Sequence, residues 1–180
     1  SGNEYFRFFD LRLAMAITLS GQLGIQWIDK TLNKLMNSFL KTKDVDYVIY
    51  CDTDSVYLAM EECIRRAGAY GAGISKVIPF MDKVCRDMFE PAIKKGFSAL
   101  REYLNAPEDA LFMKREVLCD TAIWQGKKRY LLSIWNSEGV AYEKARVKVK
   151  GVEIVKSSTP KVCRDVLRKA VEEMLNGDVD

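Results

Sequence analysis

The sequence has no histidine among its 180 residues. This absence excludes Ser-His-Asp and Cys-His nucleophilic catalysis and imidazole metal ligands, so any catalysis depends on carboxylates, lysines or an oxygen-bound metal ion. CxxC pairs are also missing, and the five cysteines occur singly at Cys51, Cys63, Cys85, Cys119 and Cys163. An odd number of isolated cysteines argues against a disulfide framework or a zinc site and is typical of a reducing compartment.

Long hydrophobic runs are missing as well. No apolar run approaches the roughly 20 residues of a membrane span, and the start of the sequence lacks the pattern of a secretory signal. Apolar residues make up 48% and charged residues 29% of the chain, which is enough apolar material for a core. We therefore expect one folded domain or slightly more, without a membrane-spanning segment.

The charge is unevenly distributed along the chain. The formal net charge is +3, yet residues 121–170 hold twelve Lys/Arg and only four Asp/Glu. The rest of the chain is acidic, with sixteen Lys/Arg and twenty-one Asp/Glu. This pattern indicates a polyanionic partner on one side and a cation site on the other. Two differently solvated faces would give the same pattern.

Apolar spacing predicts three helical regions. A helix is expected over residues 10–39 with Asp10 as its N-cap. We interpret one stripe of this helix as core: Leu11, Ala14, Thr18, Gly21, Ile25, Ile28, Leu32, Leu35 and Phe39. A second helical region, residues 80–104, is expected to be kinked or divided at Pro91. A third helix is expected to begin at Thr159-Pro160, capped by the threonine hydroxyl, and to end at Asn176-Gly177.

β-branched and aromatic residues predict the strands. Residues 45–59 are typical of a β-hairpin with an acidic tip. Three further strands are expected over residues 110–119, 129–135 and 140–150, the last two joined by a turn at residues 136–139. The predicted fold class is α+β, with a mainly antiparallel sheet and long helices packed on one face.

The strongest chemical signal is Tyr50-Cys51-Asp52-Thr53-Asp54-Ser55. Asp52 and Asp54 lie two residues apart where a strand turns, so their hard carboxylate oxygens gather near one point. Mg²⁺ prefers such ligands and would offset the cost of holding the two charges together. The alternative is a pair of solvated turn aspartates that cap backbone amides.

The same segment resembles a known family. Residues 50–57, YCDTDSVY, resemble the YxDTDSxY signature, motif C, of family B DNA polymerases, in particular the replicative enzymes of tailed bacteriophages. Further segments resemble that family in the same order: residues 2–10 the stretch after motif B, residues 124–130 the KKRY motif, and residues 151–153 and 156–160 the palm-to-thumb junction. The resemblance extends over essentially the whole chain.

The resemblance implies an RRM-like palm core, with residues 1–157 as the part of the palm after the fingers and residues 158–180 as the first thumb helix. It implies phosphoryl transfer by two Mg²⁺ ions. Asp54 would be a direct ligand, Asp52 would support the site, and Glu116 would be a carboxylate near the same pocket. Lys114 stands where the phage relatives carry an aspartate, and a lysine there would neutralise or displace a cation.

The basic region then has a specific interpretation. Lys144, Arg146, Lys148 and Lys150 alternate along one predicted strand, which would place all four on one face. Such a face is either matched by phosphates or is a solvated edge that prevents aggregation. By resemblance, the DNA-contacting residues also include Lys127, Lys128, Arg129 and Tyr130, with Lys128 and Tyr130 as the leading contacts, and Gly151 and Glu153 from the junction.

The 180 residues do not include the DxxSLYPS segment with another metal-binding aspartate, the fingers lysine helix or an exonuclease motif. We therefore expect a C-terminal palm piece of a DNA-directed DNA polymerase that is inactive alone. Its expected partners are primer-template DNA, a deoxynucleoside triphosphate and a complementary polymerase chain or segment, without a membrane, in the cytoplasm of an infected bacterium. The alternative is a non-catalytic DNA-binding or assembly fragment that keeps the palm fold.

Overall fold

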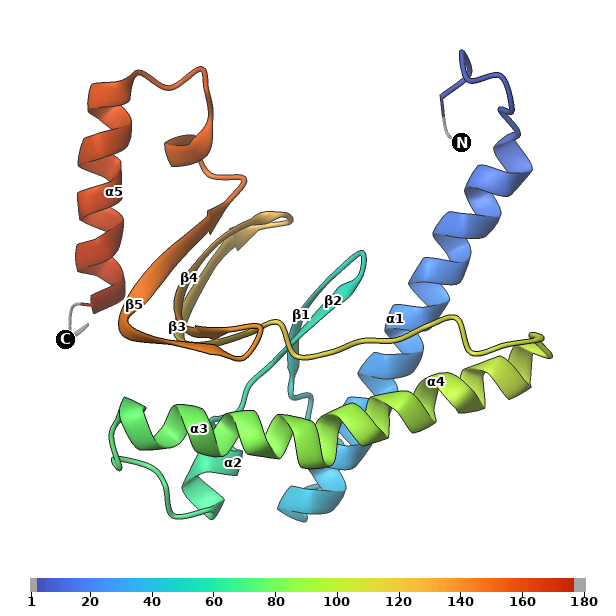
Figure 1. The fold of residues 1–180 in the computed structure, drawn as a ribbon, viewed down its shortest axis with the longest axis horizontal. Coiled ribbons are helices and arrows are strands. Elements are labelled where there is room, and N and C mark those ends of the chain that lie inside the picture. Colours follow the sequence, from blue (N-terminus) through green and yellow to red (C-terminus); the bar gives the residue numbers. More distant parts are fainter. Residues whose placement is uncertain (1–2, 177–180) are drawn as a thin grey trace. The chain divides into compact units, whose positions relative to one another are not determined.

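The computed structural model describes residues 3–176, and these form two compact units (Figure 1). The first unit combines residues up to 77 with residues 83–114. The second combines residues 78–82 with the residues from 115 onward. Both units mix helices with antiparallel strands, so the predicted α+β class is confirmed. Within residues 3–176, no helix is both long and apolar enough to cross a bilayer.

The first unit is built around α1 (Leu11–Leu40), drawn in blue in Figure 1. Its predicted cap is confirmed, because the Asp10 carboxylate accepts a hydrogen bond from the Arg12 backbone N–H at 2.8 Å. The predicted core stripe is wrong in the first half of the helix, where Leu11 is 61% exposed. The buried positions recur every fourth residue: Gly24, Ile28, Leu32, Met36 and Leu40. The helix α4 (Glu90–Leu104) packs along α1 and, with the hairpin, encloses this core.

The helix α4 is the last part of a long helical region over residues 74–104. This region begins with α3 (Ile74–Val84), passes through a π-helical turn at Cys85–Phe89 and continues as α4. The helical region is not divided at Pro91, but the π-helical turn immediately precedes this proline, which lacks a backbone N–H. The short helix α2 (Glu61–Arg66), which buries Cys63, was not predicted from the sequence.

The predicted acidic hairpin is confirmed as β1 (Val48–Asp52) and β2 (Ser55–Leu58). It forms a two-stranded sheet of its own, so the expectation that it belongs to one larger antiparallel sheet is wrong. The reason lies in what its inner face contacts. Val56 and Leu58 pack on the helical core of the first unit, so burial by helices stabilises the hairpin here.

The second unit contains the sheet β3-β4-β5, with all pairs antiparallel. Its strands are β3 (Val117–Gly126), β4 (Arg129–Ser137) and β5 (Val140–Lys150). The last strand and the turn before it are as predicted. The expected strand over residues 110–119 is wrong, because residues 110–116 are irregular and the strand extends to Gly126. Neither of the two residues between the strands, Lys127 and Lys128, is glycine, and Lys128 adopts φ 61°.

The last element of the described residues is the helix α5 (Lys161–Asn176). Val171 and Leu175 of α5 are buried in a cluster with Leu131 of β4. Other apolar residues of α5 are exposed, including Val162 at 74%. The Thr159 hydroxyl does not act as the expected cap but donates to the Glu153 carbonyl oxygen at 2.8 Å. Gly177, at the expected end of the helix, lies outside the described residues.

Candidate functional site

The tip of the β1–β2 hairpin holds the paired aspartates. Asp52 pairs with Ser55, which leaves Thr53 and Asp54 as the two-residue turn. The Asp52 carboxylate accepts hydrogen bonds from the Thr53 backbone N–H at 2.9 Å and its hydroxyl at 3.2 Å. These bonds fix the orientation of Asp52, while Asp54 is exposed to solvent at the turn.

The two faces of the hairpin differ. Val56 and Leu58 pack on the core, whereas the rings of Tyr50 and Tyr57 contact each other with centroids 5.7 Å apart. Because side chains alternate along a strand, Asp52 shares the face of Tyr50, opposite to that of the core residues. The local fold therefore directs Asp52 away from the core of its own unit.

Two asparagines of α1 fasten the start of the hairpin. The Asn33 side-chain oxygen accepts from the Tyr47 backbone N–H at 2.7 Å, and its amide nitrogen donates to Asp46 at 2.8 Å. The Asn37 amide nitrogen donates to the Val45 carbonyl oxygen at 2.7 Å. The sequence analysis missed these positioning residues. Their four-residue spacing along the helix was the available signal.

Two carboxylates, Asp29 and Asp46, lie close together at the start of this hairpin, where the Asn33 amide nitrogen donates to both. Burial raises the pKa of Asp29 above its ordinary value, and the neighbouring charge of Asp46 raises it further. The pKa of the Cys51 thiol is raised first by burial and then by Asp29 and Asp46.

The metal-ligand set on the hairpin is partial. Among residues 3–176, no group of three or more Cys, Asp or Glu is placed to hold a metal ion. Asp52 and Asp54 offer the hard oxygen ligands that Mg²⁺ prefers, but two carboxylates leave most of an octahedron unfilled. The donor chemistry fits Mg²⁺, and further ligands have to come from outside the described residues or from water and substrate.

Glu116 belongs to the second unit. Its carboxylate accepts a hydrogen bond from the Lys148 ammonium at 2.8 Å. The neighbouring Arg115 forms an ion pair with Asp82 and donates to the side chain of Asn136 at 2.7 Å. Asn136 is 4% exposed and the Arg115 side chain 11%, so this arginine anchors the start of β3 at a largely buried position. The sequence analysis did not identify Arg115 as a structural residue.

The KKRY segment forms the turn between β3 and β4. Lys127, Lys128 and Arg129 are exposed, whereas Tyr130 is only 3% exposed. The Lys150 ammonium lies 5.5 Å from the centroid of the Tyr130 ring. In this structure Tyr130 therefore supports the basic surface from beneath it.

The junction after β5 lies beside that turn. Gly151 has φ 68°, and a Cβ atom built on it would lie 2.1 Å from the carbonyl oxygen of Lys128. Glu153 forms ion pairs with Arg129 at 2.7 Å and Lys156 at 2.8 Å. The hydrogen bond from Lys156, with a smaller contribution from Arg129, lowers the pKa of Glu153 to about 2.

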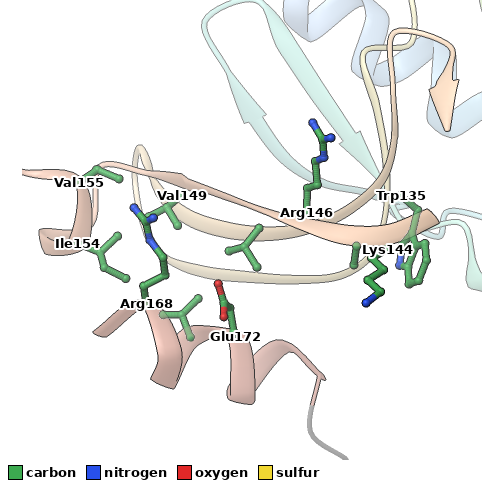
Figure 2. A pocket seen from close by; sticks show the side chains of 11 residues that line it. Trp135, Lys144, Arg146, Val149, Ile154, Val155, Arg168 and Glu172 are labelled. Carbon is green, nitrogen blue, oxygen red and sulfur yellow. The ribbon is translucent and has the colours of Figure 1, made fainter. Parts of the chain in front are cut away.

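The basic residues of β5 have different surroundings. The guanidinium of Arg146 lies 4.1 Å from the centroid of the Tyr142 ring, and Lys148 contacts Glu116. Figure 2 shows Lys144 and Arg146 leaving β5 in different directions. The strand pairing shifts between Ile134 and Asn136, opposite this stretch. This irregularity breaks the alternation, so the prediction that all four basic residues share one face is wrong at Lys144.

Comparison with known proteins gave two similar sequences. The chain is 37% identical to the DNA-directed DNA polymerase of Escherichia phage RB69 and 33% identical to that of Enterobacteria phage T4. Each alignment covers 97% of this chain and 20% of the relative. The chain is homologous to one segment of the phage family B DNA polymerases. It spans about a fifth of the length of these curated relatives. No protein-family model matches it.

The second unit also contains a groove (Figure 2). The groove has a volume of about 830 Å³ and separates part of β5 from α5. Val147, Val149 and Val171 form apolar parts of its wall, and Arg168 and Glu172 add charges from α5. Its lining residues belong to the second unit, whereas Asp52 and Asp54 belong to the first.

Proposed function

We propose that the chain is the segment of a DNA-directed DNA polymerase that carries motif C. The observation that supports this most directly is the hairpin with Asp52 and Asp54 at its tip, in a chain whose similarity to phage DNA polymerases covers 97% of its length. The supported reaction is template-directed nucleotidyl transfer onto a primer.

In this proposal, Asp54 and Asp52 hold Mg²⁺. The metal ions, when bound, neutralise charge on the triphosphate and align the attacking and leaving oxygens. Asp54 is exposed at the turn and reaches outward, whereas Asp52 is oriented by Thr53. Glu116 is proposed as a further carboxylate of the catalytic region, with Lys148 fixing its position. The remaining metal ligands come from a polymerase segment outside these 180 residues.

The proposed DNA surface lies on the second unit. Lys127, Lys128 and Arg129 are exposed at the β3–β4 turn, with Tyr130 packed below them. Three basic residues of β5 and the glycine of the junction add to this surface: Arg146, Lys148, Lys150 and Gly151. Lys144 leaves β5 in another direction (Figure 2), and Glu153 holds Arg129. Contacts of Lys and Arg with phosphates position a duplex without reading its bases. The partners are primer-template DNA and a deoxynucleoside triphosphate, in the cytoplasm of an infected bacterium.

Primer extension tests this proposal. The chain alone is expected to incorporate no nucleotide, because two carboxylates do not complete a two-metal site. Adding a polypeptide that carries the remaining segments of a phage polymerase is expected to restore extension. In that mixture, Asp54→Asn should abolish extension without weakening assembly, measured by co-purification.

A matched control separates the metal assignment from general damage. Asp44 is an exposed aspartate at φ 55°, a conformation that asparagine tolerates, so Asp44→Asn should extend like the parent chain. Extension by the chain alone would contradict the need for a complementary segment. Extension that survives Asp54→Asn would contradict the metal assignment.

The second candidate function is a non-catalytic DNA-binding or assembly fragment. The observation that favours it is the lack, within residues 3–176, of any group of three metal-ligating side chains. This candidate predicts duplex binding and assembly with the complementary polypeptide, but no extension by a mixture in which all polymerase segments are present and folded.

A further inference from the structure

The turn of the β3–β4 hairpin and the segment after β5 approach each other unusually closely. Tyr130 of β4 pairs with Lys150 of β5. The residues just beyond this pair, in the turn before β4 and in the segment after β5, are therefore close to each other. A Cβ atom on Gly151 would lie 2.1 Å from the Lys128 carbonyl oxygen, which no side chain tolerates. Both Lys128 and Gly151 adopt positive φ, at 61° and 68°. The contact therefore requires glycine at position 151.

Side chains fasten the same approach. Arg129 donates to one Glu153 carboxylate oxygen at 2.7 Å, and Lys156 donates to the other at 2.8 Å. The Thr159 hydroxyl donates to the Glu153 carbonyl oxygen at 2.8 Å. Glu153 is thus bonded to the KKRY segment on one side and to the chain that leads into α5 on the other.

The opposite side of this short segment is apolar and packs against α5. Val152 and Ile154 are 8% and 3% exposed, and they share a buried cluster with Val171 and Leu175 of α5. Residues 151–154 therefore present polar and backbone contacts to the turn and apolar contacts to the helix. No flexible linker separates the two sets of contacts.

We propose that Gly151 and Glu153 are positioning residues that couple the Lys127–Lys128 turn to α5. The turn would then meet the DNA phosphates at a fixed place relative to the helix, a consequence that rests on the proposed function. A direct contact of Glu153 with DNA is unfavourable, because phosphates repel a carboxylate. Its contribution is to hold Arg129 and the turn in place.

The effect of Glu153→Gln on the affinity for a DNA duplex distinguishes coupling from a simple effect of charge, because the two predict changes in opposite directions. Glu153→Gln removes a negative charge beside the basic surface, so charge alone predicts tighter binding to a DNA duplex. Coupling predicts weaker binding, by about two- to fivefold, because the two exposed ion pairs that join the turn to the segment before α5 are lost. Glu143→Gln makes the same charge change at an exposed position of β5 and is the matched control. It should bind as tightly as the parent chain or slightly tighter.

Hydrogen exchange measures the coupling without DNA. In Glu153→Gln, amides of residues 123–132 should exchange several-fold faster than in the parent chain, and Glu143→Gln should leave them unchanged. Gly151→Ala should have the same effect as Glu153→Gln. Its matched control is Gly126→Ala on the same hairpin, where an added Cβ meets no heavy atom within 4 Å. If circular dichroism shows that Gly151→Ala is unfolded, the comparison of Glu153→Gln with Glu143→Gln tests the coupling alone.

The outcomes separate this inference from the proposed function. Unchanged exchange in Glu153→Gln overturns the coupling, whatever the affinity for DNA. Faster exchange with binding as tight as in Glu143→Gln overturns the role in DNA positioning. A parent chain that binds no duplex at low salt contradicts the DNA surface itself, and the exchange measurement then still decides whether the turn and α5 are coupled.

Discussion

At the scale of single residues, the second unit depends on contacts that few residue types can make. Gly151 accommodates a carbonyl oxygen where any side chain would collide. Glu153 accepts hydrogen bonds from two cations although it is about half exposed, with a side-chain exposure of 47%. Ion pairs at this exposure stabilise a fold only modestly. Their larger effect here is to hold one local geometry.

Glu153 also gives the stability a defined pH dependence. Its pKa in the folded chain is lowered from the ordinary 4.5 to about 2, so the charged form is favoured by folding. This contribution is fully present above pH 4.5 and is lost as the pH falls from 4.5 towards 2. Glu153→Gln should therefore lower the unfolding free energy at neutral pH and lose this effect at the acidic end. Urea titrations across the range measure it, and a constant difference would contradict the assignment.

At the scale of elements, the buried face of α1 differs from the apolar stripe that its sequence suggests. The sequence stripe began at Leu11, whereas the buried face is Ile28, Leu32 and Met36, with Gly24 before them. Only the second half of the helix lies against α4 and the hairpin core. Large apolar side chains in the first half are more than half exposed: Leu11, Leu13, Met15, Ile17 and Leu19.

Paired truncations test this asymmetry within one helix. Leu32 is 1% exposed and Leu11 is 61% exposed, so the same substitution removes different amounts of packing. Leu32→Ala should lower the unfolding free energy by about 2–5 kcal/mol, and Leu11→Ala by less than about 0.5 kcal/mol. Chemical denaturation followed by circular dichroism provides both values. Equal effects would show that the first half of α1 is buried in solution.

At the scale of the whole molecule, the uneven charge of the sequence follows the division into units. The hairpin carboxylates belong to the first unit, and the basic turn and β5 belong to the second. The structure also shows that some of these cations already have anionic partners, since Lys148 contacts Glu116 and Arg129 contacts Glu153. The number of charges therefore overstates the number available to phosphates.

The salt dependence of DNA binding measures how many of these cations contact phosphates. Lys127 and Arg146 are exposed cations of the second unit, and each one that contacts a phosphate adds about 0.9 to the slope of log affinity against log salt. Lys127→Ala with Arg146→Ala should therefore reduce the slope by up to about two. Lys30→Ala, at an exposed position of α1, should leave it unchanged. A slope that does not respond to the double variant would place the DNA surface elsewhere.

Local sequence patterns by themselves determined several features of this protein. They predicted the hairpin with Asp52 and Asp54 at its turn, the strand β5 and the Asp10 cap, because alternation, turn residues and capping act over a few neighbouring positions. The metal and DNA roles of the candidate residues stay predictions. Ordered resemblances along the chain identified the family, which the comparisons support.

Tertiary structure alone decided the features that depend on distant neighbours. The buried register of α1 is set by what packs on it, and the separation of the strands into two sheets by which faces the helices cover. The Gly151 approach to Lys128 and the pairing of Glu116 with Lys148 join residues 23 and 32 positions apart. No periodicity encodes such contacts, because they arise only when separate elements pack against one another.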